Sequence, residues 1–246
     1  MNAIILAAGL GTRLRPLTDN IPKALVVVGG KTMLEHQILK LKKSGFKNIV
    51  INIHYFGEQI IEFLERNNNF GLNIKVSDER DLLLDTGGGI AKAGNLFDND
   101  APILVHNVDI FTNIDLKSVY NEGVKYDVML VTEKPRSNRV LYFNNNVLCG
   151  WRNKNTEETI LTSQEYSINP DDERAFMGIH VLNPKTIKLM NNHKEAFPLI
   201  PFYLNASKNR ELNIGEMFCA SDIVRIDAGK PEVLEECKEL IEKFYL

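Results

Sequence analysis

The feature that most constrains the fold is a regular alternation of short apolar runs with helical patterns along the first half of the chain. The apolar runs lie at 3–8, 48–53, 73–77 and 102–107, and the helical patterns lie at 32–44, at 57–66 and after Gly89. Strands that alternate with helices form βαβ crossovers, which produce a mainly parallel sheet covered on both faces. We therefore expect a three-layer α/β/α fold.

The rhythm changes after residue 125. Apolar runs at 140–143 and 147–151 flank three asparagines, which predicts a hairpin, and the polar stretch 152–174 is expected to be a loop. The remaining expected elements are strands at 127–131, 176–182 and 223–227, helices at 184–191 and 197–208, and a helix from Pro231. We predict one domain over 1–246, in which 136–175 is a small β-rich insertion into a mixed sheet.

Net charge and cysteine content limit the expected cellular compartment and the expected classes of binding partner. The net charge of −3 gives no global attraction to nucleic acid or to an anionic membrane, and no apolar run is long enough to span a bilayer. Three scattered cysteines indicate reduced thiols rather than a disulfide framework, and the first apolar run is typical of a buried strand, not of a signal peptide. We expect a cytoplasmic protein without nucleic-acid or membrane partners, and the composition leaves a homo-oligomer open.

The segment 6–18 directly follows the first predicted strand. In an open α/β sheet, ligands bind beyond the carboxyl ends of the strands. Gly9 and Gly11 allow a ligand to approach the backbone N–H groups, and Arg13 and Arg15 can add charge-assisted contacts to phosphate oxygens. These residues predict an anion site.

Segment 6–18 has three other possible interpretations. A dinucleotide-binding fingerprint needs a third glycine where Leu14 stands, and a Walker A loop ending at 30–32 needs a glycine where Leu25 stands. Taken alone, the segment also fits a solvated glycine-rich turn with two surface arginines.

Two acidic residues are candidates for binding a metal. Asp109 follows the strand at 102–107, and Asp227 closes the strand at 223–227. Mg²⁺ prefers hard oxygen ligands and is commonly held by one or two carboxylates together with phosphates. Taken alone, Asp109 fits a helix cap or a loop acid equally well, and Asp227 fits a residue that only precedes a turn.

Segment 6–18, followed by Pro-Lys-Ala-Leu at 22–25, resembles the signature of the sugar nucleotidyltransferases, the pyrophosphorylases that make NDP-sugars. The resemblance implies a Rossmann-like nucleotide-diphospho-sugar transferase fold and substrates that are a nucleoside triphosphate and a sugar 1-phosphate. It implies three catalytic residues: Arg13 grips the triphosphate, Lys23 balances charge at the reacting phosphates, and Asp109 shares a Mg²⁺ cofactor with Asp227. The sugar phosphate is already an anion, so no general base is needed.

The stretch 82–90 resembles one branch in particular, the N-acetylmuramic acid 1-phosphate uridylyltransferases of cell-wall recycling. UTP is therefore the expected donor, and the glycines 87–89 are expected to face its base. Mannose-1-phosphate guanylyltransferases and choline-phosphate cytidylyltransferases share the first loop and stay open as alternatives. The expected nucleotide-binding residues are Leu6, Ala8, Gly9, Gly11, Thr12, Arg13, Lys23, Thr86, Gly87 and Gly88.

The sugar side departs more from the family. Asn107, Lys154 and Gly178 are the expected substrate-binding residues, with Lys154 preferred over Lys134 as the family's lysine because Lys134 lies one strand too early. Residues 136–175 lack the glycine-rich element of the uridylyltransferase branch, and Val108 replaces the glycine that precedes the family's metal aspartate, which would crowd the sugar pocket.

Two other protein classes remain as alternatives. The first is a nucleotide-sugar binding module without turnover, which Val108 favours and the joint presence of Arg13, Lys23, Asp109 and Asp227 disfavours. The second is a nicotinamide-dependent oxidoreductase, which needs an acidic residue at the end of the second strand, where Asn52, Ile53 and His54 stand instead.

Overall fold

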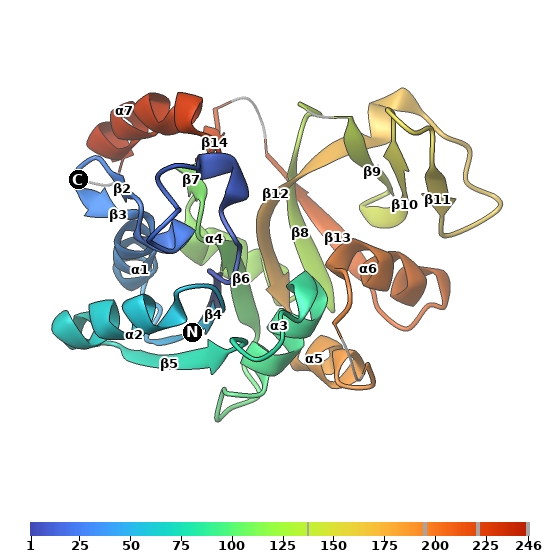
Figure 1. Cartoon of the computed structure of the whole chain (residues 1–246). Coiled ribbons are helices and arrows are strands. Elements are labelled where there is room, and N and C mark those ends of the chain that lie inside the picture. Colours follow the sequence, from blue (N-terminus) through green and yellow to red (C-terminus); the bar gives the residue numbers. More distant parts are fainter. Residues whose placement is uncertain (137, 194–195, 220–221, 245–246) are drawn as a thin grey trace.

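A computed structural model describes residues 1–136, 138–193, 196–219 and 222–244 (Figure 1). Its main sheet runs in the order β11-β10-β9-β12-β6-β1-β4-β5. In addition, β8 pairs with β12, and β13 pairs with β8. The strands of this sheet are β1 (Asn2–Leu6), β4 (Asn48–Ile53), β5 (Asn73–Asp78), β6 (Ile103–Asn107), β8 (Val128–Glu133), β9 (Arg139–Asn144), β10 (Val147–Asn153), β11 (Thr159–Leu161), β12 (Glu173–Leu182) and β13 (Ile214–Phe218).

The central strands β6, β1, β4 and β5 are parallel, as the alternating pattern predicts. Their near-continuous apolar sequences suit burial on both faces. Leu6 pairs in register with Asn52 on one side and with Asn107 on the other. The three strands therefore end at one level, which brings residues from distant parts of the sequence to one edge of the sheet.

Helices cover both faces of the sheet and enclose two separate cores, which confirms the three-layer α/β/α arrangement (Figure 1). One core contains apolar residues of α1, α2, α4 and α7, and the other contains those of α3, α5 and α6. The helices are α1 (Met33–Lys43), α2 (Gly57–Arg66), α3 (Asp85–Gly94), α4 (Leu116–Gly123), α5 (Pro184–Met190), α6 (Leu199–Lys208) and α7 (Leu234–Phe244).

Two small sheets complete the fold around the end of β1. The first joins β2 (Val27–Val28) to β3 (Lys31–Thr32), and the second joins β7 (Ile110–Thr112) to β14 (Arg225–Asp227). Short 3-10 helices lie at η1 (Thr12–Leu14), η2 (Lys23–Leu25), η3 (Asn68–Gly71), η4 (Pro170–Asp172) and η5 (Pro231–Val233). Among the residues described, no helix has the length and apolar character that crossing a membrane would require.

The predicted hairpin is confirmed, and Asn145 and Asn146 both adopt the left-handed conformation that its two-residue turn requires. The prediction of a loop over 152–174 is wrong in part. Trp151 pairs with Ile160, so β11 extends the hairpin, and β12 begins at Glu173. Together β9, β10 and β11 form the end of the sheet opposite β5 (Figure 1).

Six of these strands and helices were not predicted: β2, β3, β7, β11, β13 and α4. In β13, Gly215 and Glu216 interrupt the apolar pattern that would mark a strand. Glu216 is nevertheless buried, because its carboxylate accepts hydrogen bonds from Thr132 Oγ1 at 2.5 Å and from Arg174 Nε at 3.0 Å. Polar partners on neighbouring strands thus compensate a charge that the local sequence places in the sheet.

Candidate active site

A cavity of about 950 Å³ opens at the carboxyl ends of β1, β4 and β6. This is the edge at which open α/β sheets bind ligands. Of the residues expected to bind substrates or metal, the cavity is lined by Leu6, Ala8, Gly9, Lys23, Thr86, Asn107, Asp109 and Asp227. Gly11, Thr12, Arg13, Gly87, Gly88, Lys154 and Gly178 are not among its lining residues.

The floor of the cavity contains a buried polar pair, Asn52 and Glu79. The Ala7 N–H donates to Asn52 Oδ1 at 2.7 Å, and Asn52 Nδ2 donates to Glu79 Oε1 at 2.8 Å. Burial raises the pKa of the Glu79 carboxyl. The pair therefore links the ends of β4 and β5 to the start of the glycine loop. The site prediction omitted both residues, although each stands at the carboxyl end of a predicted strand.

The glycine loop after β1 is shaped by Gly9 and Gly11. No atom lies within 4 Å of the position that a Cβ would take at Gly9, so this part of the loop is open. Gly11 has φ +66°, its carbonyl accepts a hydrogen bond from Thr18 Oγ1 at 2.8 Å, and an added Cβ there would lie 3.0 Å from the Lys23 Cβ. Gly11 thus serves to pack the loop against Lys23, while Ala8 and Gly9 line the cavity.

Lys23 and Asp109 form an ion pair at the cavity wall, between Lys23 Nζ and Asp109 Oδ2. Their side chains are only 12% and 13% exposed. Asp227 is held beside them by the pairing of β14 with β7, in which the Ala228 N–H donates to the Asp109 carbonyl at 2.8 Å. The two aspartates that we predicted to share a metal therefore lie on neighbouring backbone segments and line one cavity.

Arg13 reaches this group from the glycine loop. A methyl group added at Gly229 would lie 2.6 Å from Arg13 Nη2 and 2.7 Å from Asp227 Oδ1, so the guanidinium and the carboxylate flank the same glycine. The Gly229 N–H also donates to Asp227 Oδ1 at 2.9 Å. Arg13 is exposed and stands beside the Asp227 carboxylate.

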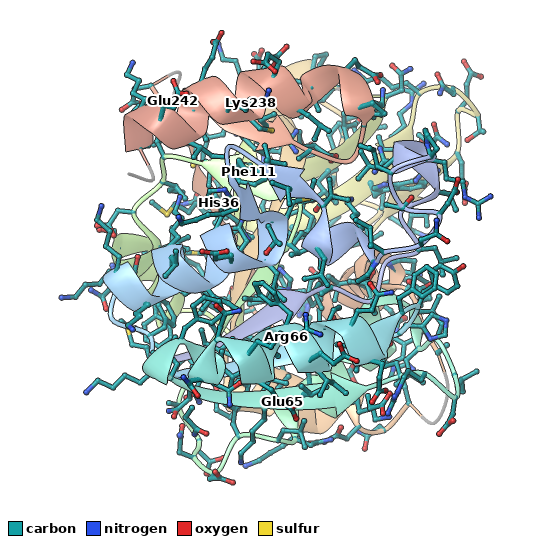
Figure 2. The ribbon with its side chains drawn as sticks, turned by 60° about the vertical axis from the view of Figure 1, so that its left-hand side comes forward. His36, Glu65, Arg66, Phe111, Lys238 and Glu242 are labelled. Atoms are coloured by element: carbon teal, nitrogen blue, oxygen red, sulfur yellow. The ribbon has the colours of Figure 1, made fainter. Side chains whose placement is uncertain are left out.

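Helix α1 supports the strand that follows Asp109. Gln37 Nε2 donates to the Ile110 carbonyl at 2.8 Å, and Lys40 Nζ donates to the Thr112 carbonyl. His36 lies edge-on to Phe111, with 5.6 Å between the ring centroids (Figure 2). Burial lowers the pKa of the Lys40 ammonium to about 7. The sequence did contain a signal for these contacts, because polar residues lie on the inner face of the helix predicted at 32–44.

The other end of the cavity is formed by β9, β10, β12 and α6. Apolar side chains there include Leu141, Trp151, Phe176 and Leu199, and Arg136, Arg139 and Arg225 add positive charge. None of these arginines was predicted as a site residue, because the intervals between them in the sequence give no hint that the fold brings them together.

The structure places two of the expected substrate-binding residues elsewhere. Lys154 is outside the cavity lining because its ammonium is paired with Glu173 Oε2 at 2.6 Å. Gly178 has φ +78° at an irregularity of β12, and an added Cβ would lie 2.9 Å from Asn107 Nδ2. Gly178 thus makes room for Asn107, which does line the cavity.

The glycines of α3 are used for packing. The Gly87 N–H is not open to the cavity, because it donates to the Phe197 carbonyl at 2.9 Å. Gly87 and Gly88 are buried, and the helix begins at Asp85, before the glycines, instead of after Gly89. Thr86 remains at the cavity.

Gly89→Ala is expected to destabilise the fold by about 1–3 kcal/mol and to raise the KM for the donor nucleotide. The added Cβ would lie 2.7 Å from Glu79 Oε1 and 3.0 Å from Asn52 Nδ2, so it would push apart the polar pair at the cavity floor. Denaturant unfolding and initial rates at varied nucleotide concentration measure the two effects.

Gly94→Ala is the matched control on the same helix. Its Cβ would lie 2.7 Å from Ile187 Cδ1, which is not part of the cavity lining. It should affect stability and leave the nucleotide KM unchanged. Equal nucleotide KM values for the two variants would contradict a role of the Asn52–Glu79 pair in donor binding.

Val108 is among the residues that line the cavity, but little of it is exposed there. Its side chain is 3% exposed and belongs to the hydrophobic core beneath α1 and α7. The residue in place of the family's glycine therefore adds little surface to the substrate space.

Comparison with known protein families decides the assignment of the chain. The sequence model described as "Nucleotidyl transferase" matches residues 2–197, which span β1 to the segment before α6 and include the glycine loop, Lys23 and Asp109. The chain belongs to the nucleotidyl transferase family. Asp227, with the β14 strand that carries it, lies outside the matched range.

Curated members of the family provide the nearest functional context. The N-acetylmuramate alpha-1-phosphate uridylyltransferase of Neisseria meningitidis serogroup B is 44% identical over 143 residues, which are 56% of this chain and 62% of that protein. The enzyme of the same name from Caulobacter vibrioides is 44% identical over 109 residues, covering 44% and 45% of the two chains. The mannose-1-phosphate guanyltransferase of Schizosaccharomyces pombe is 31% identical over 210 residues, covering 80% and 55%. The chain thus spans only about half of these relatives' length.

Solved structures show the same fold over nearly the whole chain. HddC from Yersinia pseudotuberculosis, complexed with GMP-PN, superposes with a TM-score of 0.74 at 21% identity and covers 97% of this chain and 98% of that one. A putative glucose-1-phosphate thymidylyltransferase from Bacillus anthracis superposes with a TM-score of 0.74 at 22% identity, covering 98% and 94%. The nucleotidyltransferase fold that the resemblance implies is therefore confirmed.

The carboxylates present fit a divalent cation of the magnesium type. No group of three or more His, Cys, Asp or Glu side chains at metal-binding distance occurs among the described residues, which argues against a closed protein cage. Asp109 and Asp227 supply two hard oxygen ligands next to an open cavity, and phosphate oxygens and water can complete the coordination.

Proposed function

We propose that this protein transfers a nucleotidyl group from a nucleoside triphosphate to a sugar 1-phosphate, in a Mg²⁺-dependent reaction that releases pyrophosphate. The observation that carries the proposal is the grouping of Lys23, Asp109 and Asp227 at one end of a large cavity, with Arg13 beside Asp227. Paired carboxylates for a cation and two basic side chains for phosphates are what such a transfer needs.

The position of each residue in the site determines its proposed role. The open backbone at Gly9, with Arg13, receives the triphosphate, and Lys23 neutralises charge at the phosphate that reacts. Mg²⁺ bound by Asp109 and Asp227 would supply further charge neutralisation at the phosphate oxygens. The oxygen of the sugar phosphate forms a bond to the α-phosphorus while the bond to pyrophosphate breaks, and no proton has to be removed. Positioning and electrostatics therefore account for the rate.

We propose UTP as the donor and N-acetylmuramic acid 1-phosphate as the acceptor. The similarity of the stretch 82–90 to that branch and the two relatives with this name support the choice. The yeast relatives named mannose-1-phosphate guanyltransferase match a longer part of this chain at lower identity, so GTP with mannose 1-phosphate is the second candidate. A cytoplasmic role in cell-wall recycling follows from the first choice.

The test is a matrix of the four ribonucleoside triphosphates against a panel of sugar 1-phosphates, measured as pyrophosphate release with and without Mg²⁺. The panel contains N-acetylmuramic acid, N-acetylglucosamine, mannose and glucose 1-phosphates, with phosphocholine as a non-sugar acceptor. We expect the highest rate of pyrophosphate release with UTP and N-acetylmuramic acid 1-phosphate, and no release without a divalent cation. Binding of nucleotide without turnover in any combination would identify a binding module instead.

A further inference from the structure

Arg225 is a half-buried cation that lines the cavity and is not used by the reaction described above. Its side chain is only 16% exposed, and its Nε donates to Glu133 Oε1 at 2.7 Å. Among the residues that the structure describes, no hydrogen-bond partner is found for its two terminal nitrogens, and Arg225 lines the cavity. A guanidinium held by one nitrogen and open on the other two is suited to bind an anion.

The carboxylate that holds Arg225 also holds a second arginine. Glu133 is 6% exposed on its side chain, and its Oε2 lies 3.3 Å from Arg136 Nη2. Two positive charges thus share one buried negative charge, and both arginines line the cavity. A buried carboxylate is costly unless it is paired, so Glu133 fixes the Arg225 guanidinium in place and still leaves net positive charge facing the cavity.

The position of Arg225 on β14 indicates where an anion held by its guanidinium would lie. Side chains two residues apart on a strand point to the same face, so Arg225 and Asp227 face the cavity together. Arg13 and Lys23 serve the glycine-loop side of the carboxylates, whereas Glu133 and Arg136 belong to the end of β8 and the segment before β9. An anion bound by Arg225 therefore lies next to Asp227 on the side away from the glycine loop.

We infer that Arg225, fixed by Glu133 and assisted by Arg136, binds the phosphate of the acceptor and orients its oxygen toward the donor. The inference rests on the proposed function. A phosphate monoester is a dianion whose oxygens match the two free guanidinium nitrogens. This role was expected of Lys154, which is instead paired with Glu173 outside the cavity lining.

The experiment compares Arg225→Ala and Arg225→Lys with the matched control Lys154→Ala. Initial rates are measured at varied acceptor with saturating UTP and Mg²⁺, and at varied UTP with saturating acceptor, using the acceptor that the wild type prefers. Arg225→Ala should raise the acceptor KM about 10- to 100-fold and change the UTP KM less than about twofold. Arg225→Lys should be intermediate, because it keeps the charge and loses the fork, and Lys154→Ala should match the wild type.

Several results would overturn the inference. One is an unchanged acceptor KM in folded Arg225→Lys, which also decides the case if Arg225→Ala does not fold by circular dichroism. Another is a rise of the acceptor KM in Lys154→Ala without such a rise in the Arg225 variants. A third is a rise confined to acceptors whose sugar carries a carboxylate, since the guanidinium would then bind the sugar and not the phosphate. If the wild-type protein shows no turnover with any acceptor, the proposed function itself is refuted. This outcome is distinct from failure of the inference, in which the wild type is active and the Arg225 variants keep its acceptor KM.

Discussion

Replacing Asp109 with alanine is expected to lower kcat at least about thousandfold and to leave the fold intact. Its carboxylate lies against Lys23 and beside Asp227, so its loss removes one of two cation ligands and leaves the Lys23 ammonium without its partner. The residual rate should rise only weakly with Mg²⁺ concentration. Pyrophosphate release at graded Mg²⁺, with circular dichroism on the same samples, measures both effects.

Asp222→Ala is the matched control. Asp222 is an exposed acid in the segment that leads to β14, and it is not among the residues that line the cavity. Its replacement should leave both kcat and the Mg²⁺ dependence near wild-type values. A near-normal rate in folded Asp109→Ala would show that the cation, if one acts, is bound elsewhere.

Replacing Lys23 with methionine is expected to lower kcat/KM for the donor about 100- to 1000-fold. The ammonium is largely buried at the wall of the cavity, where a positive charge acts more strongly on a phosphate than it does in water. Methionine keeps the unbranched side chain, so the packing of the Lys23 Cβ against Gly11 should persist. Initial rates at varied UTP measure the loss, and Lys31→Ala is the control on a nearby lysine that is not among the residues lining the cavity.

The same variant separates the role of Lys23 from that of Asp109. Because Lys23 pairs with the Asp109 carboxylate, its removal frees that carboxylate for a cation. Calorimetric titration with Mn²⁺ in the absence of nucleotide should therefore show binding at least as tight as in the wild type. Weaker Mn²⁺ binding in Lys23→Met would mean that the lysine organises the metal site instead of competing for it.

The layered fold and one half of the site could be predicted from the sequence. Strands that alternate with helices allow essentially one architecture, and their carboxyl ends meet at one edge. Accordingly, Gly9 of the glycine loop and Asp109 both line the cavity. Asp227 also stands at the end of a predicted strand. Its proximity to Asp109 depends on the pairing of β14 with β7, which no local sequence pattern predicts.

The other half of the site could not be predicted in this way. The end of the cavity away from the glycine loop is formed by β9, β10, β12 and α6, which are far apart in the sequence, so its arginines have no characteristic spacing. Lys154 fits a family pattern in sequence but is neutralised by Glu173, a contact that only the register of the strands creates. The glycines of α3 likewise have two possible uses, and burial against Phe197 and Glu79 decides for packing.

The pairing of β14 with β7 has a consequence for biosynthesis. The sheet and both cores are largely encoded before residue 219, whereas one of the two aspartates arrives with β14 and is secured by the packing of α7. A ribosome-bound chain can thus complete its glycine loop and most of its sheet and still lack the second acid. Premature termination after β13 would yield a chain that lacks Arg225 and Asp227, and with Asp227 one of the two acids proposed to hold the cation.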